Sequence, residues 1–359
     1  MRAALVLAAR GLGRVAPNPA VGCILVRDGR AVGRGWTQPG GRPHAETEAL
    51  RRAGAAARGA CAYVTLEPCA HHGRTPPCAE ALAEAGIARC VVALEDPDRR
   101  VAGAGLARLR AAGIDVATGI GAEAAQALNA GYLLRQREGR PLITLKLASS
   151  LDGRIATRSG ESRWITGQAA RARAHMLRAE NDAVLVGSTT AVADNPRLDV
   201  RLDGLEAASP LRVVVDGRLR LPLTHDLVAG AGERPTLLIT RRGADAGRRR
   251  AYETAGVEVI AVAADGENRL SLAEAFTALG KRGLTRVLVE GGGRLAAGLL
   301  RADLVDRLVW FRAPKVLGGD AVPAVAGFGL ERLAAAPRLE RASVETLDDD
   351  AVETYRRKD

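Results

Sequence analysis

One histidine, one glutamate and two cysteines within the first eighty residues have the types and order that a hydrolytic metal centre requires. These residues are His44, Glu46, Cys69 and Cys78. One imidazole and two thiolates can hold a zinc ion in a tetrahedral arrangement with the fourth position open. Water in that position loses a proton near neutral pH and becomes a nucleophile. Glu46 follows His44 by two residues and is placed to carry protons between such a water and a substrate nitrogen.

The order of this motif is typical of zinc-dependent nucleobase deaminases, which have two residues between the cysteines; eight separate Cys69 from Cys78 here. Two other interpretations exist. The cysteines could be small buried hydrophobic residues, or His71 or His72 could complete a closed structural zinc site. The full motif, with proline before each cysteine, favours an open catalytic site.

The local pattern predicts the elements that must hold these residues. We expect a helix over 45–57 beside His44, a strand over 61–66 that leads to Cys69, and a helix over 78–85 that begins at Cys78, where the helix start favours a negative sulfur. Asp28-Gly29 predicts a hairpin turn. The other expected elements are helices over 3–10, 104–112 and 121–137 and strands over 21–27, 30–35, 90–94 and 114–118. Together they predict a three-layered α/β domain with zinc between two helix starts.

Length and composition limit the remaining possibilities. A chain of 359 residues predicts two domains, and we place the boundary at Glu138–Pro141, giving domains 1–140 and 141–359. We expect no membrane span and, from five cysteines with two assigned to metal, a cytoplasmic protein without disulfides. The net charge of +11 comes from scattered arginines, and aromatic residues make up only 3%, so we expect no nucleic-acid partner.

The second half predicts another α/β domain with a mainly parallel sheet and an antiparallel edge. Glu290 ends a strand, and Gly291, Gly292 and Gly293 precede a helix, where a backbone can approach an anion closely. This run does not match the Rossmann fingerprint, so a plain turn and a dinucleotide site both remain open. The expected strands cover 142–148, 183–187, 211–215, 236–240, 257–262, 285–290 and 304–311, the helices 168–180, 244–255, 271–281 and 292–301, and a terminal hairpin 339–347 and 351–356.

Across nearly its whole length the chain resembles the bifunctional deaminase/reductase family of riboflavin biosynthesis. The family form of the zinc motif has the long spacing between cysteines that is present here. The segments that carry the resemblance are 17–19, 21–23, 44–46 and 67–78 in the first half, and 144–153, 162–166, 194–198 and 290–293 in the second.

The resemblance implies a cytidine-deaminase-like first domain and a dihydrofolate-reductase-like second domain. The first would remove the 2-amino group of 2,5-diamino-6-(5-phosphoribosylamino)pyrimidin-4(3H)-one with zinc on His44, Cys69 and Cys78 and Glu46 as proton carrier. Asn18 lies between two prolines; alone it indicates turn chemistry, and the resemblance makes it a partner of the pyrimidine.

The second domain would use NADPH to reduce 5-amino-6-(5-phosphoribosylamino)uracil to the ribitylamino product. The resemblance implies catalytic roles for Lys146 and Asp152, which the pattern alone would leave at a solvated strand end. It implies substrate binding by Ser162, Arg178, Leu198, Arg201 and Glu290. It implies NADPH binding by Ala148, Trp164, Thr190, Asp194, Gly292, Gly293, Arg294, Leu295, Ala296, Ala297 and Gly298. We take Arg241 or Arg242 as candidates for the 2′-phosphate of NADPH, and we expect a homo-oligomer, either dimer or tetramer.

The alternative is a nucleoside or nucleic-acid deaminase with an unrelated appended domain. A nucleic-acid deaminase would show clustered basic and aromatic residues, which this sequence lacks.

Overall fold

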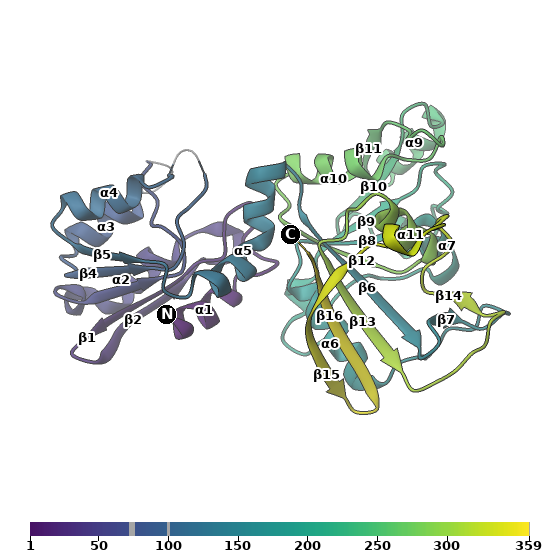
Figure 1. Cartoon of the computed structure of the whole chain (residues 1–359). Coiled ribbons are helices and arrows are strands. Elements are labelled where there is room, and N and C mark those ends of the chain that lie inside the picture. Colours follow the sequence, from purple (N-terminus) through teal and green to yellow (C-terminus); the bar gives the residue numbers. More distant parts are fainter. Residues whose placement is uncertain (72–75, 99–100, 359) are drawn as a thin grey trace. The chain divides into compact units, whose positions relative to one another are not determined.

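The computed structural model describes residues 1–71, 76–98 and 101–358, so His72 and the end of the loop that precedes Pro76 lie outside the described residues. The chain divides into two compact units, Met1–Gly139 and Arg140–Asp359 (Figure 1). None of the described helices is both long and apolar enough to cross a lipid bilayer.

The first unit is a five-stranded sheet with helices on both faces. Strand order is β2-β1-β3-β4-β5, in which β1 runs antiparallel to β2 and β3 while β3, β4 and β5 are parallel. Its elements are α1 (Arg2–Ala9), β1 (Gly22–Arg27), β2 (Arg30–Trp36), η1 (Pro39–Gly41), α2 (Ala45–Ala53), η2 (Gly54–Ala57), β3 (Cys61–Val64), α3 (Cys78–Glu84), β4 (Arg89–Val92), α4 (Ala104–Ala111), β5 (Asp115–Thr118) and α5 (Ala122–Glu138).

Two glycines let helices approach this sheet from opposite sides. A Cβ atom on Gly22 would lie 1.9 Å from the Ala4 carbonyl oxygen of α1, and one on Gly35 would lie 2.1 Å from the Ala45 carbonyl oxygen of α2. Gly35 pairs with Cys23, the neighbour of Gly22, so the two glycines face opposite sides of the pleat. The α1 and α2 helices therefore form outer layers around the sheet, which confirms the predicted three-layered arrangement.

The second unit is built on a nine-stranded sheet of order β11-β10-β9-β8-β12-β6-β13-β16-β15 (Figure 1). The strands from β11 to β13 are parallel, and β16 and β15 form an antiparallel edge. Its elements are β6 (Leu142–Ser150), β7 (Arg154–Ala156), α6 (Gln168–Ala179), β8 (Ala183–Gly187), α7 (Ser188–Asp194), η3 (Glu206–Ala208), β9 (Leu211–Val215), α8 (Asp226–Ala229), β10 (Thr236–Arg241), α9 (Ala246–Thr254), β11 (Glu258–Val262), α10 (Leu272–Lys281), β12 (Arg286–Glu290), α11 (Gly293–Arg301), β13 (Arg307–Ala313), β14 (Val322–Pro323), η4 (Leu333–Ala335), β15 (Leu339–Leu347) and β16 (Asp350–Arg357).

Alternate residues of the central strands feed two separate cores. Leu185 and Val287 pack with Phe276 of α10 in one cluster, whereas Val184 and Leu288 belong to another cluster. Both faces of the sheet are therefore buried, as is usual for a parallel sheet. Because both faces are packed, the central strands are held in place. Their carboxyl ends, which carry polar residues, therefore have fixed positions.

Besides the 3-10 turns η3 and η4, two short strands and two short α-helices of the second unit were not predicted: β7, β14, α7 and α8. Each has seven residues or fewer, which is too short for a helical or strand periodicity to be recognised. One of them matters for function, because α7 carries Thr190 and Asp194.

Candidate active sites

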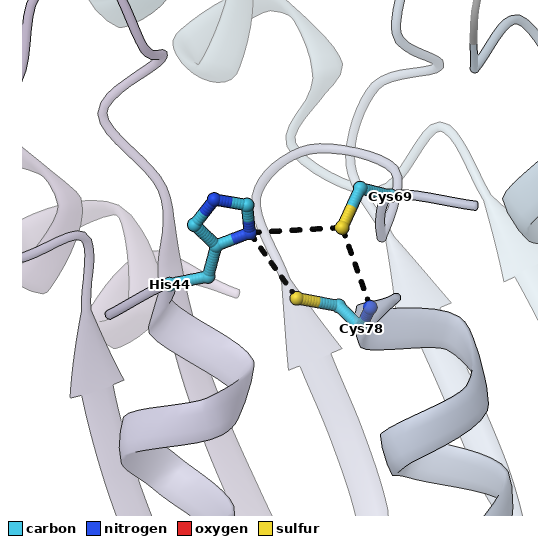
Figure 2. A group of neighbouring side chains, drawn as sticks. All are labelled: His44, Cys69 and Cys78. Carbon is cyan, nitrogen blue, oxygen red and sulfur yellow. Dashed lines mark hydrogen bonds between the residues drawn. The ribbon is translucent and has the colours of Figure 1, made fainter. Parts of the chain in front are cut away.

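Three side chains from separate segments of the first unit point toward one position (Figure 2). His44 precedes α2, Cys69 follows β3, and Cys78 begins α3. The His44 Nδ1 atom lies 3.3 Å from the Cys78 Sγ and 3.6 Å from the Cys69 Sγ. Ligand atoms of a tetrahedral zinc ion at ordinary bond lengths are separated by about 3.6 to 3.8 Å. The donor set and its spacing therefore fit zinc.

The electrostatics of the two thiols favour a cation between them. A hydrogen bond from the Cys78 thiol lowers the pKa of Cys69, and the Cys78 backbone N–H donates to the same sulfur at 3.3 Å. The hydrogen bond raises the pKa of Cys78, because it uses the Cys78 proton. A divalent cation can take the place of that shared proton.

Glu46 lies in the first turn of α2 and is only 3% exposed. Burial raises its pKa to about 7. A group with that pKa can both accept and donate a proton near neutral pH, which is the property of an effective general acid–base catalyst. Glu46 lines the same cavity as His44 and Cys69, so its carboxyl group faces the space where a substrate would bind.

This cavity has a volume of about 280 Å³. Asn18 lines it, as does His71, whose Nδ1 is buried without a hydrogen-bond partner among the described residues. Gly41 has a φ of 83°, and a Cβ atom there would lie 1.8 Å from the Asn18 Nδ2. The Asn18 amide is therefore held by close packing against a position that only glycine can fill.

Glu67 lines the same cavity and organises the loop after β4, a role that the local sequence pattern did not predict. One carboxylate oxygen accepts the backbone N–H groups of Asp96 and Gly103, and the other accepts those of Gly105 and Leu106. These bonds tie the end of β3 to the start of α4. The signal in the sequence is its place directly before Pro68 and Cys69.

Two further cavity residues come from distant parts of the chain. The Tyr132 hydroxyl of α5 donates to the Asp96 Oδ1 at 2.9 Å, and both residues line the cavity. Burial raises the pKa of Asp96 and of Tyr132. No local pattern could have found this pair, because the fold brings positions 96 and 132 together.

A larger cavity of about 680 Å³ lies in the second unit at the carboxyl ends of β6, β8 and β12. Ligands of open α/β sheets bind at this edge. The cavity brings together eleven of the residues singled out in the second half: Lys146, Ala148, Ser162, Arg178, Thr190, Asp194, Leu198, Glu290, Gly292, Gly293 and Arg294.

Two opposite charges form a fixed pair in this cavity. The Arg178 guanidinium donates to both carboxylate oxygens of Glu290, at 2.5 and 3.0 Å. Burial alone would raise the pKa of Glu290, but the Arg178 charge holds it at about 2. Lys146 lies nearby with its Nζ 5.6 Å from the centre of the Phe311 ring, and burial lowers its pKa.

Three further residues singled out in the sequence, Trp164, Arg201 and Asp152, lie outside the lining of this cavity. Trp164 is 62% exposed and stacks with the Arg171 guanidinium. The Arg201 guanidinium pairs with Asp199. Asp152 accepts the Ser150 hydroxyl and the backbone N–H groups of Leu317 and Gly318. Asp152 thus anchors a loop, and its carboxylate is already satisfied.

A second cavity of about 660 Å³ in the same unit shares Thr190, Gly292 and Arg294 with the first. Gly291 and Gly292 have φ values of 80° and 89°, a left-handed conformation that glycine adopts readily. They lead into α11, whose N-terminus favours an anion. Of the predicted cofactor residues on α11, Leu295, Ala297 and Gly298 line this cavity, whereas the Ala296 side chain is buried in the core.

Comparison with known families gives a match in each unit. Residues 1–94 match the cytidine and deoxycytidylate deaminase zinc-binding region. Residues 141–352 match the RibD C-terminal domain.

Several relatives match this chain over nearly its whole length. The chain is 44% identical to the riboflavin biosynthesis protein RibD of Escherichia coli (strain K12), over 98% of this chain and 96% of the relative. Among solved structures, Acinetobacter baumannii RibD is similar with a TM-score of 0.88 and 39% identity, covering 99% of this chain and 97% of that one. A Thermotoga maritima diaminohydroxyphosphoribosylaminopyrimidine deaminase/5-amino-6-(5-phosphoribosylamino)uracil reductase gives a TM-score of 0.86 at 33% identity, covering 100% and 97%.

Proposed function

Because this chain belongs to the RibD family of riboflavin biosynthesis proteins, we propose that its first unit deaminates a phosphoribosylaminopyrimidine and its second unit reduces the product. The protein is a bifunctional deaminase and reductase that uses zinc and NADPH. An unrelated appended domain is excluded, since the RibD C-terminal domain matches residues 141–352. The Thermotoga maritima relative is named for the same two substrates that we assign to this chain.

His44, Cys69 and Cys78 would hold the zinc ion of the deaminase. Zinc with three protein ligands supplies a Lewis acid that makes water nucleophilic near neutral pH. Glu46 takes a proton from water and passes it to the pyrimidine ring nitrogen. It then takes the hydroxyl proton of the addition product and delivers it to the departing 2-amino group, which leaves as ammonia. Its raised pKa supports this role, because the carboxyl group must accept and release a proton twice in each turnover.

Asn18 and His71 would position the pyrimidine in the first cavity. Both line it beside Glu46. The Asn18 amide can donate and accept hydrogen bonds, and the buried Nδ1 of His71 is available for a substrate atom. Fixed polar groups of this kind orient a ring so that the carbon that bears the amine faces the nucleophile.

In the second unit, NADPH supplies a hydride. Reduction of the ring-opened imine of the ribosylamino group adds this hydride to carbon and a proton to nitrogen. Lys146 is the half-buried cavity group that we assign as proton donor. Arg178 holds Glu290 ionised, which keeps a negative charge near the ammonium of Lys146. Ser162, Leu198 and Arg178 would contact the substrate, and the glycines before α11, with Thr190 and Asp194, would contact the cofactor.

We propose less direct roles for four of the predicted residues, none of which lines the cavity that contains Lys146. Asp152 is better described as a positioning residue for the loop that contains Leu317 and Gly318. Trp164 and Arg201 would contact ligands only after a rearrangement of their segments. Ala296 would contribute only its backbone.

We also propose that the chain forms a homo-oligomer. The edge strand β15 carries Val344, which is 54% exposed, and Leu333 nearby in sequence is 87% exposed. Unpaired edge strands with exposed apolar residues are commonly covered by a partner. Sedimentation of the purified protein as a monomer would contradict this part of the proposal.

The observation that carries the proposed function is the convergence of His44, Cys69 and Cys78 beside buried Glu46. The test is an assay of the diaminopyrimidine phosphate by mass spectrometry of the products. The deaminated compound should accumulate without NADPH, and the reduced compound should appear when NADPH is added. Recovery of unchanged substrate under both conditions would reject the proposal.

A further inference from the structure

A third cavity in the second unit has a strongly basic lining. It has a volume of about 270 Å³, and five of its nine lining residues are arginines, against a single carboxylate. The lining residues are Asp216, Gly217, Arg218, Arg220, Arg241, Asn268, Arg269, Leu270 and Arg294. Such a concentration of guanidinium groups in a small hollow suits a ligand with high negative charge.

This basic cavity continues the groove that we assign to NADPH. It shares Arg269, Leu270 and Arg294 with the 660 Å³ cavity. That cavity shares Thr190 and Gly292 with the one that contains Lys146. Arg294 lines all three. The groove therefore runs from the proposed reaction site, past the start of α11, to the arginines.

The five arginines are not equivalent. Arg241 donates to the Gly217 and Asn268 carbonyl oxygens, and Arg269 pairs with Asp265, so these two already have fixed partners. By contrast, the Arg218 and Arg294 guanidiniums are exposed, and neither makes a hydrogen bond or ion pair with the described part of the chain. These two can turn toward a ligand at little cost.

The one carboxylate in the lining is directed at the backbone. Asp216 is 1% exposed and accepts N–H groups of Arg218, Arg220 and Leu221, which shapes the turn after β9. Its charge is thus partly offset, and the net charge facing the cavity is positive. The Arg220 guanidinium donates to the Ser188 Oγ at 2.7 Å, and its Nε lies 4.0 Å from the Asp216 Oδ1, which holds it between the turn and the start of α7.

We propose that Arg218, Arg220 and Arg294 bind the 2′-phosphate of NADPH and thereby set the preference of the reductase for NADPH over NADH. The inference rests on the proposed function of the second unit. A phosphate monoester carries nearly two negative charges and three acceptor oxygens, whereas NADH has only a neutral hydroxyl at that position. Arg242 is excluded from this role, because its guanidinium pairs with Glu274 and it does not line the cavity.

The test compares Arg218→Gln and the double variant Arg218→Gln/Arg220→Gln with the full-length wild-type protein. Dissociation constants for NADPH and NADH are measured by titration calorimetry. Charge-assisted hydrogen bonds are strong enough that we expect NADPH binding to weaken by about 10- to 100-fold and NADH binding to stay unchanged. The matched control is Arg242→Gln, which removes a guanidinium from the end of the adjacent strand and should leave both constants unchanged.

Three outcomes would overturn the inference. The ratio of NADPH to NADH affinity could stay unchanged in both variants, or Arg242→Gln could lose as much NADPH affinity as they do. The third outcome is a raised KM for the pyrimidine phosphate with unchanged NADPH binding. The last would mean that the arginines bind the phosphate of the substrate. A wild-type protein that binds no NADPH would instead contradict the proposed function, so the two failures are distinguishable. Arg218 is exposed, and thermal unfolding should confirm that its variants fold normally.

Discussion

Glu46 is the residue on which the deaminase proposal depends most. Replacing it by glutamine keeps the size of the side chain and removes its capacity to exchange a proton. We expect Glu46→Gln to lower ammonia release by about 10²- to 10⁴-fold, the usual contribution of a general acid–base group. Zinc content and the reduction of supplied deaminated substrate should be retained. Glu84→Gln, at an exposed position of α3, is the control, and ammonia release at near wild-type rate in Glu46→Gln would refute the assignment.

Lys146 gives a second prediction at this scale. We expect Lys146→Met to lower kcat for reduction by about 100-fold or more, with unchanged NADPH affinity, because the proton donor is lost. Exposed Lys281 on α10 provides the control substitution. A loss of NADPH binding with normal kcat would assign Lys146 to cofactor binding instead.

The lowered pKa of Lys146 predicts the direction in which the rate of reduction changes with pH. Only the protonated ammonium can donate, and burial moves its pKa below the ordinary lysine value of about 10.4. Reduction should therefore slow as pH rises toward that value, and the loss should begin below it. A kcat that stays constant from neutral pH to pH ~10.4 would argue against a titrating lysine at this site.

How far single residues could be predicted depends on distance along the chain. The zinc ligands lie within one short motif, and the structure places the three together. Asp96 and Tyr132 could not be predicted, because they meet only through the fold. Trp164 and Arg201 were assigned by resemblance alone, and here their side chains contact Arg171 and Asp199.

At the scale of elements, the close contact of α2 with β2 holds the deaminase site in place. A Cβ atom on Gly35 would lie 2.1 Å from the Ala45 carbonyl oxygen and 2.6 Å from the Ala49 nitrogen. We expect Gly35→Ala to push α2 outward, to destabilise the protein by about 1–3 kcal/mol, and to weaken zinc binding through displacement of His44. Urea unfolding and metal analysis would measure the two effects.

The control for that substitution is Gly232→Ala. A Cβ atom there meets nothing within 4 Å, so stability and zinc content should stay near wild type. If Gly35→Ala also left both unchanged, the close approach of α2 would not be what positions the metal ligands.

Apolar central strands were predictable for a physical reason that the unpredicted elements lack. Apolar runs such as Ala183–Gly187 and Leu211–Val215 indicate buried parallel strands, and their bounds agree with prediction. The α7 helix spans only Ser188–Asp194 and has no amphipathic period to detect. Its position is fixed by packing after β8, which a local pattern cannot reveal.

At the scale of the whole molecule, two reactions are carried by two units with separate cavities. Removal of zinc with a chelator should therefore abolish ammonia release and leave NADPH oxidation with supplied deaminated substrate intact. Added zinc should restore the first activity, and metal analysis should find one zinc per chain. Loss of both activities on chelation, with the fold retained, would contradict the assignment of zinc to the first unit alone.

The measurement that tests the account most directly follows ammonia and NADPH together, starting from the diaminopyrimidine phosphate. The wild-type protein should release ammonia without NADPH, and with NADPH present it should oxidise one NADPH for each ammonia released. Glu46→Gln should oxidise no NADPH from this substrate and normal amounts from the deaminated one. Oxidation of NADPH by Glu46→Gln from the diamino compound would contradict the order of the two reactions.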